Sequence, residues 1–148
     1  MPLIHFVETK ESEKNKCLCY WVESFYLKGR KIQVMTSEII EAQNLDHLLW
    51  VFSQKSFVPH EVGCPEQADP LTPVYIVTET RKIPGFDVLV MSTECPLDYV
   101  AQFTESVHFV CMDNDAHRKR CRQYWLEARK RGFELKHHRY RPLAALKN

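Results

Sequence analysis

The sequence has few glycines, and none of them falls in a pattern that holds phosphate groups. The four glycines, at positions 29, 63, 85 and 132, form neither GxGxxG nor GxxxxGK[ST]. The first apolar run leads instead into VETKESEK, at the place where a Rossmann protein brings backbone amides close to a pyrophosphate. Nucleotide binding at that place is therefore not expected, and no cofactor is predicted.

Metal-ligand spacings are also lacking. Of the six cysteines only Cys17 and Cys19 are close together, and no CxxC or paired-histidine spacing accompanies them. His137 and His138 are adjacent, so in a strand they would point to opposite faces and could not hold one metal ion together. No metal site is predicted, and the thiols are expected to be reduced.

A cysteine–histidine nucleophilic site is formally possible from the composition. Cys111 or Cys121 could act with His108 or His117 if the fold brought them together. Buried structural cysteines are the commoner state, however. No catalytic residue is therefore predicted.

Long apolar runs are absent as well. None approaches the roughly 20 residues that cross a bilayer, and the N-terminal MPLIHFVETK lacks the basic-then-apolar order of a signal peptide. These features favour a cytoplasmic protein without a membrane partner.

Charge is nearly balanced overall but not along the chain. The formal net charge is +1, yet from position 116 onward eleven Lys and Arg residues stand against only Glu127 and Glu134. Such an asymmetry suits one localised acidic partner better than diffuse coating of DNA or a membrane.

Five short apolar runs rich in β-branched and aromatic residues predict strands. Several are apolar on both faces, as is typical of an α/β sheet covered on both sides. FELKHHRYR after Gly132 predicts a last strand at the sheet edge, protected by its charges. At 148 residues we expect a single domain, 1–148. The five runs are Leu3 to Val7, Ile32 to Met35, Val74 to Val77, Val88 to Met91 and Val107 to Val110.

Helical patterns lie between these strands, over residues 11–28, after Ser37 as a capping residue, and over Leu97 to Phe103. Asp113 or Asp115 is expected to cap a last, basic helix. The connection TRKIPGF, residues 80–86, is too short for a helical crossover. Its flanking strands are therefore either an antiparallel pair or separated in the sheet, and we expect a mostly parallel, mixed sheet.

The first candidate binding surface is LLWVFSQKSFVPHEV, residues 48–62. Trp50 lies beside the apolar stripe of its helix rather than on it, and Phe57 follows in a loop. Pro59 biases the preceding residue toward extended geometry. Two large aromatics so placed could anchor a protein interface or belong to the core.

The second is the basic helix HRKRCRQYWLEARKRG, residues 117–132. Helical spacing puts Cys121, Tyr124 and Ala128 on a packing face. A neighbouring stripe carries guanidinium groups on both sides of an aromatic ring, as would suit a peptide carboxyl terminus or single-stranded nucleic acid. This stripe consists of Arg118, Arg122, Trp125 and Arg129.

Three segments together carry a resemblance over essentially the full length. LLW and FVPH between Leu48 and His60, FTESVHFV at Phe103 to Val110, and ARKRGFEL at Ala128 to Leu135 agree in order and spacing with the chi subunits of bacterial DNA polymerase III. The chain resembles that family of clamp-loader accessory proteins. The resemblance implies a Rossmann-like three-layer α/β fold and a non-catalytic adaptor of DNA replication in the bacterial cytoplasm, at the nucleoid-associated replisome.

The resemblance also implies partners. Members form a 1:1 heterodimer with the psi subunit, and through it join the clamp loader; here that surface would contain Trp50, Phe57, Val58, Pro59 and His60, and would also serve an alternative repair-helicase partner. A second surface would bind the acidic C-terminal tail of single-stranded DNA-binding protein, so that contact with nucleic acid is mainly indirect. Direct binding of single-stranded nucleic acid is the alternative function.

The implied tail site lies on the basic helix. A tyrosine is common in the family where Trp125 stands, so Tyr124 competes with Trp125 as the ring that contacts the tail. The implied tail-site residues are Val110 at the pocket floor, Arg118 and Arg122 as cations, Trp125 as the ring and Arg129 beside it.

Overall fold

The computed structural model describes residues 2–53 and 57–146, with side chains through residue 144. Seven strands form one sheet in the order β3-β4-β2-β5-β6-β1-β7, and every pairing among the described strands is parallel. The α/β class is therefore confirmed. The strands are β1 (Leu3–Thr9), β2 (Ile32–Met35), β3 (His60–Val62), β4 (Val74–Val77), β5 (Val88–Met91), β6 (Glu105–Cys111) and β7 (Glu134–His138).

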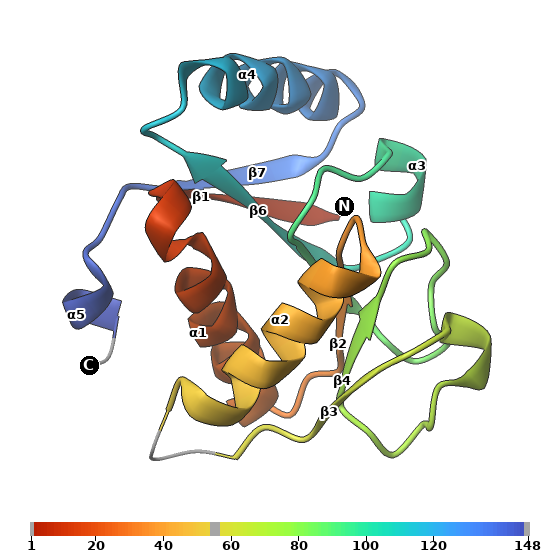
Figure 1. The fold of residues 1–148 in the computed structure, drawn as a ribbon. Helices are drawn as coiled ribbons and strands as arrows, with labels where there is room; N and C mark the ends of the chain where they lie inside the picture. The colour runs from red at the N-terminus through yellow and green to blue at the C-terminus, as the bar shows by residue number, and fades with distance from the viewer. Residues whose placement is uncertain (1, 54–56, 147–148) are drawn as a thin grey trace.

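Helices cover both faces of the sheet (Figure 1). On one side α1 (Lys14–Leu27) and α2 (Ile39–Val51) bury one core cluster, which includes Leu18, Val22 and Leu45. On the other side α3 (Leu97–Val100) and α4 (Asp115–Lys130) bury a second cluster around Phe6 and Tyr124. The short α5 (Leu143–Leu146) lies beside α1. None of the described helices is long and apolar enough to cross a membrane.

The expectation of a mixed sheet was wrong. The short connection does separate its strands, since β2 lies between β4 and β5, but it returns to a parallel strand without a helix. Ile83 and Phe86 of this connection are buried in the second cluster. Gln33, a fully buried side chain of β2, hydrogen-bonds to the backbone of the connection between β4 and β5. It accepts from the Ile83 amide (2.9 Å) and donates to the Arg81 carbonyl (2.6 Å). These bonds satisfy backbone groups that a helix would have satisfied internally.

The starts of two helices also differ slightly from the sequence expectations. The first helical segment opens with a 3-10 turn, Glu11–Glu13, before α1. Glu38 rather than Ser37 is the N-cap of α2, and the Ser37 hydroxyl donates instead to the Glu41 carboxylate (2.9 Å). Strand β3 and helix α5 were not predicted. The expected edge strand is confirmed, because β7 pairs only with β1 in the described sheet and carries mostly exposed or half-buried polar residues.

Candidate functional site

The basic helix α4 is held at its start by an asparagine. The Asn114 side chain accepts from the His117 amide (3.0 Å), which makes Asn114 the N-cap. The expected caps, Asp113 and Asp115, were therefore one residue off on either side. Asp113 instead accepts from the Glu11 amide (3.0 Å), tying the helix start to the turn that precedes α1. The helix ends before Gly132, whose φ of 89° fits the left-handed stop that glycine favours.

The rotation of α4 about its axis is set by its packing face. Cys121, Tyr124 and Ala128 are all buried, as expected. The Tyr124 hydroxyl donates to the carbonyl of Cys95 (2.6 Å) inside the core. Trp125 is only half-buried, and its ring packs edge-on against Phe6 with centroids 4.9 Å apart. Trp125 thus offers the accessible ring of the helix, and Tyr124 does not.

The arginines of α4 and of its C-cap divide into two groups. Arg120 forms a bidentate ion pair with Glu94, from Nε to Oε1 (2.9 Å) and from Nη2 to Oε2, and Arg131, just after the helix, pairs with Asp98 (2.8 Å). Both are therefore neutralised by residues that flank or belong to α3. Ion pairing raises the pKa of Arg120 further, so its charge is permanent.

The predicted stripe forms the second group. Arg118, Arg122 and Arg129 are exposed. Among the described residues, Arg122 and Arg129 form no ion pair, unlike Arg118. Arg118 has only a 3.7 Å contact with exposed Asp115, and such surface pairs contribute little. Arg118 and Arg122, with Asp115 and Lys119, line a cavity of about 270 Å³.

Val110 lies beneath this helix. It is the sixth residue of β6, stands opposite Glu8 of β1 in register, and is half-buried. It packs against the same core cluster as Trp125. The fold thus places an apolar floor, an aromatic ring and unpaired guanidinium groups on one side of the molecule, which are the parts needed to bind an acidic chain end that carries an apolar side chain.

The first candidate surface, residues 48–62, lies apart from α4. Trp50 is 47% exposed and Phe57 65% exposed, and their ring centroids are 5.2 Å apart. Both rings are therefore at the surface rather than in the core. Val58 is buried and Pro59 half-buried. Residues 54–56 of this segment lie outside the described residues.

The His60 ring packs against the Trp50 ring. Its side chain is fully buried, and its ring lies 4.1 Å from the Trp50 ring. Nδ1 lies 2.7 Å from the Val58 carbonyl and Nε2 lies 2.9 Å from the Asp46 carbonyl, so that the ring sits between α2 and the start of β3. An anchor held on a rigid base loses less conformational entropy when a partner binds.

The fold does bring together the cysteine and histidines considered for catalysis. Cys121 Sγ lies 3.5 Å from His108 Nε2 and 3.6 Å from His117 Nδ1. Burial raises the pKa of the Cys121 thiol to about 12 and lowers the pKa of His108 to about 3. Both are therefore neutral at physiological pH, and neither the thiolate nor the imidazolium of a nucleophilic pair is formed. Among the described residues no cluster of three or more His, Cys, Asp or Glu side chains could hold a metal ion.

The carboxyl edge of the parallel sheet, where related architectures bind ligands, is bridged by the chain's own side chains. Lys14 of α1 donates to the Ser92 carbonyl after β5, and the Ser92 hydroxyl donates to Glu41 of α2. Glu41 also accepts from Ser37 after β2. These contacts link α1 and α2 to the ends of β5 and β2. The polar groups that a nucleotide would contact there are therefore already hydrogen-bonded within the protein.

One feature was missed by the sequence analysis. Pairing of β7 with β1 brings the C-terminal segment at 138–141 against Tyr20 and Trp21 of α1, and a pocket forms between them. The basic and aromatic HHRYR was the available signal, but which helix it meets follows only from the strand order.

These layers and this strand order define a doubly wound α/β protein with a Rossmann-like architecture. The fold is similar to that of the Mss116p DEAD-box helicase domain 2 bound to an RNA duplex, with a TM-score of 0.61 and 13% identity over 99% of this chain and 67% of that one. Such a low identity establishes the fold alone. Residues 1–136 match the family described as DNA polymerase III chi subunit, HolC, and the chain belongs to that family.

Relatives of the same description are distant. The chain is 28% identical to the DNA polymerase III subunit chi of Haemophilus influenzae over 119 residues, which are 79% of this chain and 81% of that protein. It is 26% identical to the probable DNA polymerase III subunit chi of Rickettsia prowazekii over 93 residues, which are 62% of this chain. The match spans 55% of that relative, about half its length. The resemblance inferred from three sequence segments is thereby confirmed.

Proposed function

We propose that this chain is a non-catalytic adaptor of the DNA polymerase III holoenzyme, which joins the psi subunit to the acidic C-terminal tail of single-stranded DNA-binding protein. Family membership supports partners within the holoenzyme. The observation that carries the tail site is the arrangement of Trp125 between exposed Arg122 and Arg129, with Trp125 and Val110 packed against the same core cluster.

Each part of the tail site has a physical role. An arginine can hold a terminal carboxylate through two parallel hydrogen bonds. The Trp125 ring and Val110 would receive the tail's last apolar side chain. Arg118 adds long-range attraction, which is screened by salt over about 8 Å at physiological ionic strength.

The psi site would be the exposed pair Trp50 and Phe57, with Val58, Pro59 and His60 as its support. Large aromatics on a packed base are typical of interface hot spots. The pair lies on the α2 side of the sheet, whereas α4 covers the other face (Figure 1). The two partners could then be bound at the same time. A repair helicase would compete with psi because it would use the same rings.

A bridging experiment tests both surfaces at once. An immobilised peptide ending in Asp-Phe-Pro-Phe should retain psi only when this chain is present. Arg122→Gln should lose both proteins from the resin, whereas Phe57→Ala should lose psi and keep the chain. Arg120→Gln is the matched control, since Arg120 is paired with Glu94, and Leu71→Ala is the control for an exposed apolar side chain.

Equal losses with Arg120→Gln and Arg122→Gln would contradict the tail site. Retention of psi by Phe57→Ala would contradict the psi site. Tight binding to bare oligonucleotides with a steep salt slope, together with no saturable peptide binding at low salt, would favour direct nucleic-acid binding instead.

A further inference from the structure

The chain that follows β7 lies beside the carboxyl ends of β1 and β6. Val110 of β6 stands opposite Glu8 of β1. The last residue of β7, His138, stands opposite the residue before Glu8, so Arg139 comes next to Glu8. The Tyr140 amide agrees with this course of the chain, since it donates to the Glu8 carboxylate (2.9 Å). Neighbouring strands are about 4.8 Å apart, so the backbone of Arg139 lies about 10 Å from that of Val110.

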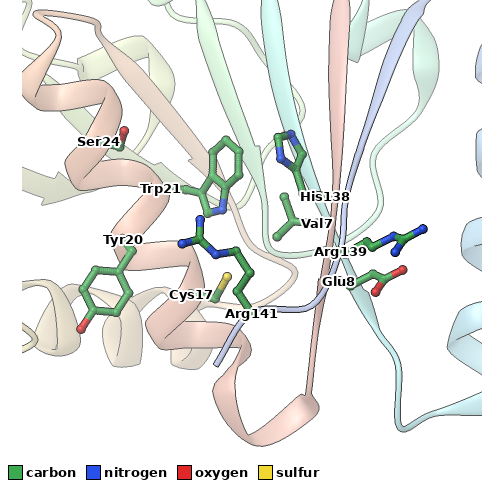
Figure 2. A pocket seen from close by; sticks show the side chains of 9 residues that line it. All are labelled: Val7, Glu8, Cys17, Tyr20, Trp21, Ser24, His138, Arg139 and Arg141. Carbon is green, nitrogen blue, oxygen red and sulfur yellow. The ribbon is translucent and has the colours of Figure 1, made fainter. Parts of the chain in front are cut away.

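The side chains of Glu8 and Arg139 point to the α4 side of the sheet. Figure 2 shows both of them pointing away from the Trp21 ring, which belongs to α1 on the other side. Alternation along β1 requires this of Glu8, because Phe6, two residues earlier, belongs to the core cluster beneath α4. Arg139 is exposed, and among the described residues it forms no ion pair. Its guanidinium group is therefore available on the face that α4 covers.

The stripe of α4 faces the same edge of the sheet. Arg120, on the other flank of the helix, pairs with Glu94 near α3. Trp125, the ring of the stripe, packs on Phe6 of β1, which is the strand that pairs with the edge strand β7. The stripe and Arg139 therefore border one surface, the stripe from the helix and Arg139 from the edge of the sheet.

Glu8 brings a carboxylate to this surface, and the C-terminal segment hydrogen-bonds both of its oxygens. His137 Nε2 lies 2.6 Å from Oε2, and because a carboxylate only accepts, His137 is the donor. The Tyr140 amide donates to Oε1. The Glu8 side chain is only 17% exposed. Its repulsion of an acidic chain is therefore reduced by groups of this protein.

We propose that Arg139 is a further cation of the tail site and binds a side-chain carboxylate of the tail, while His137 shields Glu8. This inference rests on the proposed adaptor function. Three residues of extended chain span about 10 Å, which is also about the distance from Val110 to Arg139. With the last phenylalanine of an Asp-Phe-Pro-Phe end at Val110, the aspartate reaches Arg139. His137 and Arg139 lie beyond residues 1–136, which match the family, so the match assigns them no role.

A pair of peptides tests the contact between Arg139 and the aspartate. Labelled peptides that end in Asp-Phe-Pro-Phe or Asn-Phe-Pro-Phe are titrated with the full chain at physiological salt, and their anisotropy is measured. Arg139→Gln should lower the affinity for the aspartate peptide about threefold and that for the asparagine peptide less than about 1.5-fold. Lys136→Gln is the matched control, because Lys136 is an exposed cation of β7 that alternation places on the α1 side. It should change neither affinity.

A charge rescue tests the role of His137. His137→Ala should lower the affinity for the aspartate peptide about twofold, because the Glu8 carboxylate then repels the tail. The double variant with Glu8→Gln should regain the wild-type affinity, since the charge that His137 shields is gone. A merely structural role of His137 would not be rescued in this way. His137 is exposed, so both variants should fold.

Arg122→Gln separates the failure of this inference from the failure of the tail site. If Arg122→Gln abolishes peptide binding while Arg139→Gln and Lys136→Gln behave alike, the tail site stands and the role of Arg139 is overturned. An equal loss of both peptides with Arg139→Gln would also overturn it, and an unrescued His137→Ala would overturn the shielding of Glu8. Unchanged binding by Arg122→Gln would contradict the tail site and this inference together.

Discussion

Tyr124 and Cys95 are joined by a hydrogen bond in the core, in which the tyrosine hydroxyl donates to the cysteine carbonyl over 2.6 Å. Tyr124 is 2% exposed. Because successive residues of a helix are about 100° apart around its axis, this bond turns the neighbouring Trp125 toward the edge of the packed face. One buried contact thus decides which aromatic ring of α4 a ligand can meet.

Tyr124→Phe should separate stability from binding. The substitution keeps the ring but leaves the Cys95 carbonyl without its partner, so the free energy of unfolding should fall by about 1–3 kcal/mol. Affinity for the acidic tail peptide should change less than about twofold, below 0.5 kcal/mol. Urea denaturation and peptide anisotropy measure the two quantities. A large loss of affinity with unchanged stability would mean that Tyr124, and not Trp125, faces the ligand.

Trp125→Ala should show the reverse pattern for binding. Removal of the half-buried ring should lower the affinity for the tail peptide by at least about tenfold, which is 1.4 kcal/mol, because the peptide's last side chain no longer has the Trp125 ring to pack against. Trp125→Tyr should restore most of the affinity, since a smaller ring remains in the same place. Peptide anisotropy at fixed salt is the measurement. Equal affinity of the alanine and tyrosine variants would remove Trp125 from the proposed site.

The fold class could be predicted because parallel strands are covered on both sides. Val74–Val77 and Val88–Met91 are buried at every position, and this pattern is visible in the sequence as uninterrupted apolar runs. Strand β3 could not be found in the same way. It has three residues, with one exposed and one half-buried, and it exists because its backbone pairs with Val74–Ile76 of β4.

The candidate site was predictable where it depends on helical spacing alone. The burial of Cys121, Tyr124 and Ala128 follows from the 3.6-residue period. The pairing of Arg120 with Glu94 does not, because the two residues meet only once α4 lies across the loop after β5. The N-cap was ambiguous for a local reason: residues 113–115 are all Asp or Asn, and each could cap a helix.

Gln33→Leu should strongly destabilise the protein despite the similar size of the two side chains. Gln33 is fully buried and bonds the Ile83 amide, the Arg81 carbonyl and the Tyr99 hydroxyl (2.7 Å). Leucine would leave the first two without partners inside the molecule, at about 1–3 kcal/mol each. We expect the free energy of unfolding to fall by about 3 kcal/mol in urea denaturation.

Gln102→Leu is the matched control, because Gln102 is exposed and its side-chain amide lies 3.5 Å from the Asp98 carbonyl, a long contact. It should change stability by less than about 0.5 kcal/mol. Similar effects of the two substitutions would show that the crossover between β4 and β5 does not depend on Gln33.

His108 should make the protein sensitive to mild acid. Burial lowers its pKa to about 3 in the folded protein, whereas an unfolded histidine titrates near 6.5. Below about pH 6.5 the unfolded chain therefore takes up a proton that the folded protein does not. The stability that neutral His108 contributes is complete above that pH and is lost as the pH falls toward 3, by up to about 1.4 kcal/mol per pH unit.

His108→Phe should flatten this acid limb, since a phenyl ring can keep the edge-on packing against Phe6 (5.4 Å) and carries no titratable group. Urea denaturation at several pH values between 4 and 7.5 measures the slope. Part of the slope should remain, because desolvation also lowers the pKa values of the half-buried His117 and His138. Identical slopes for the wild type and His108→Phe would show that His108 is protonated in the folded protein, and that its buried Nδ1, which has no hydrogen-bond partner among the described atoms, finds one when charged.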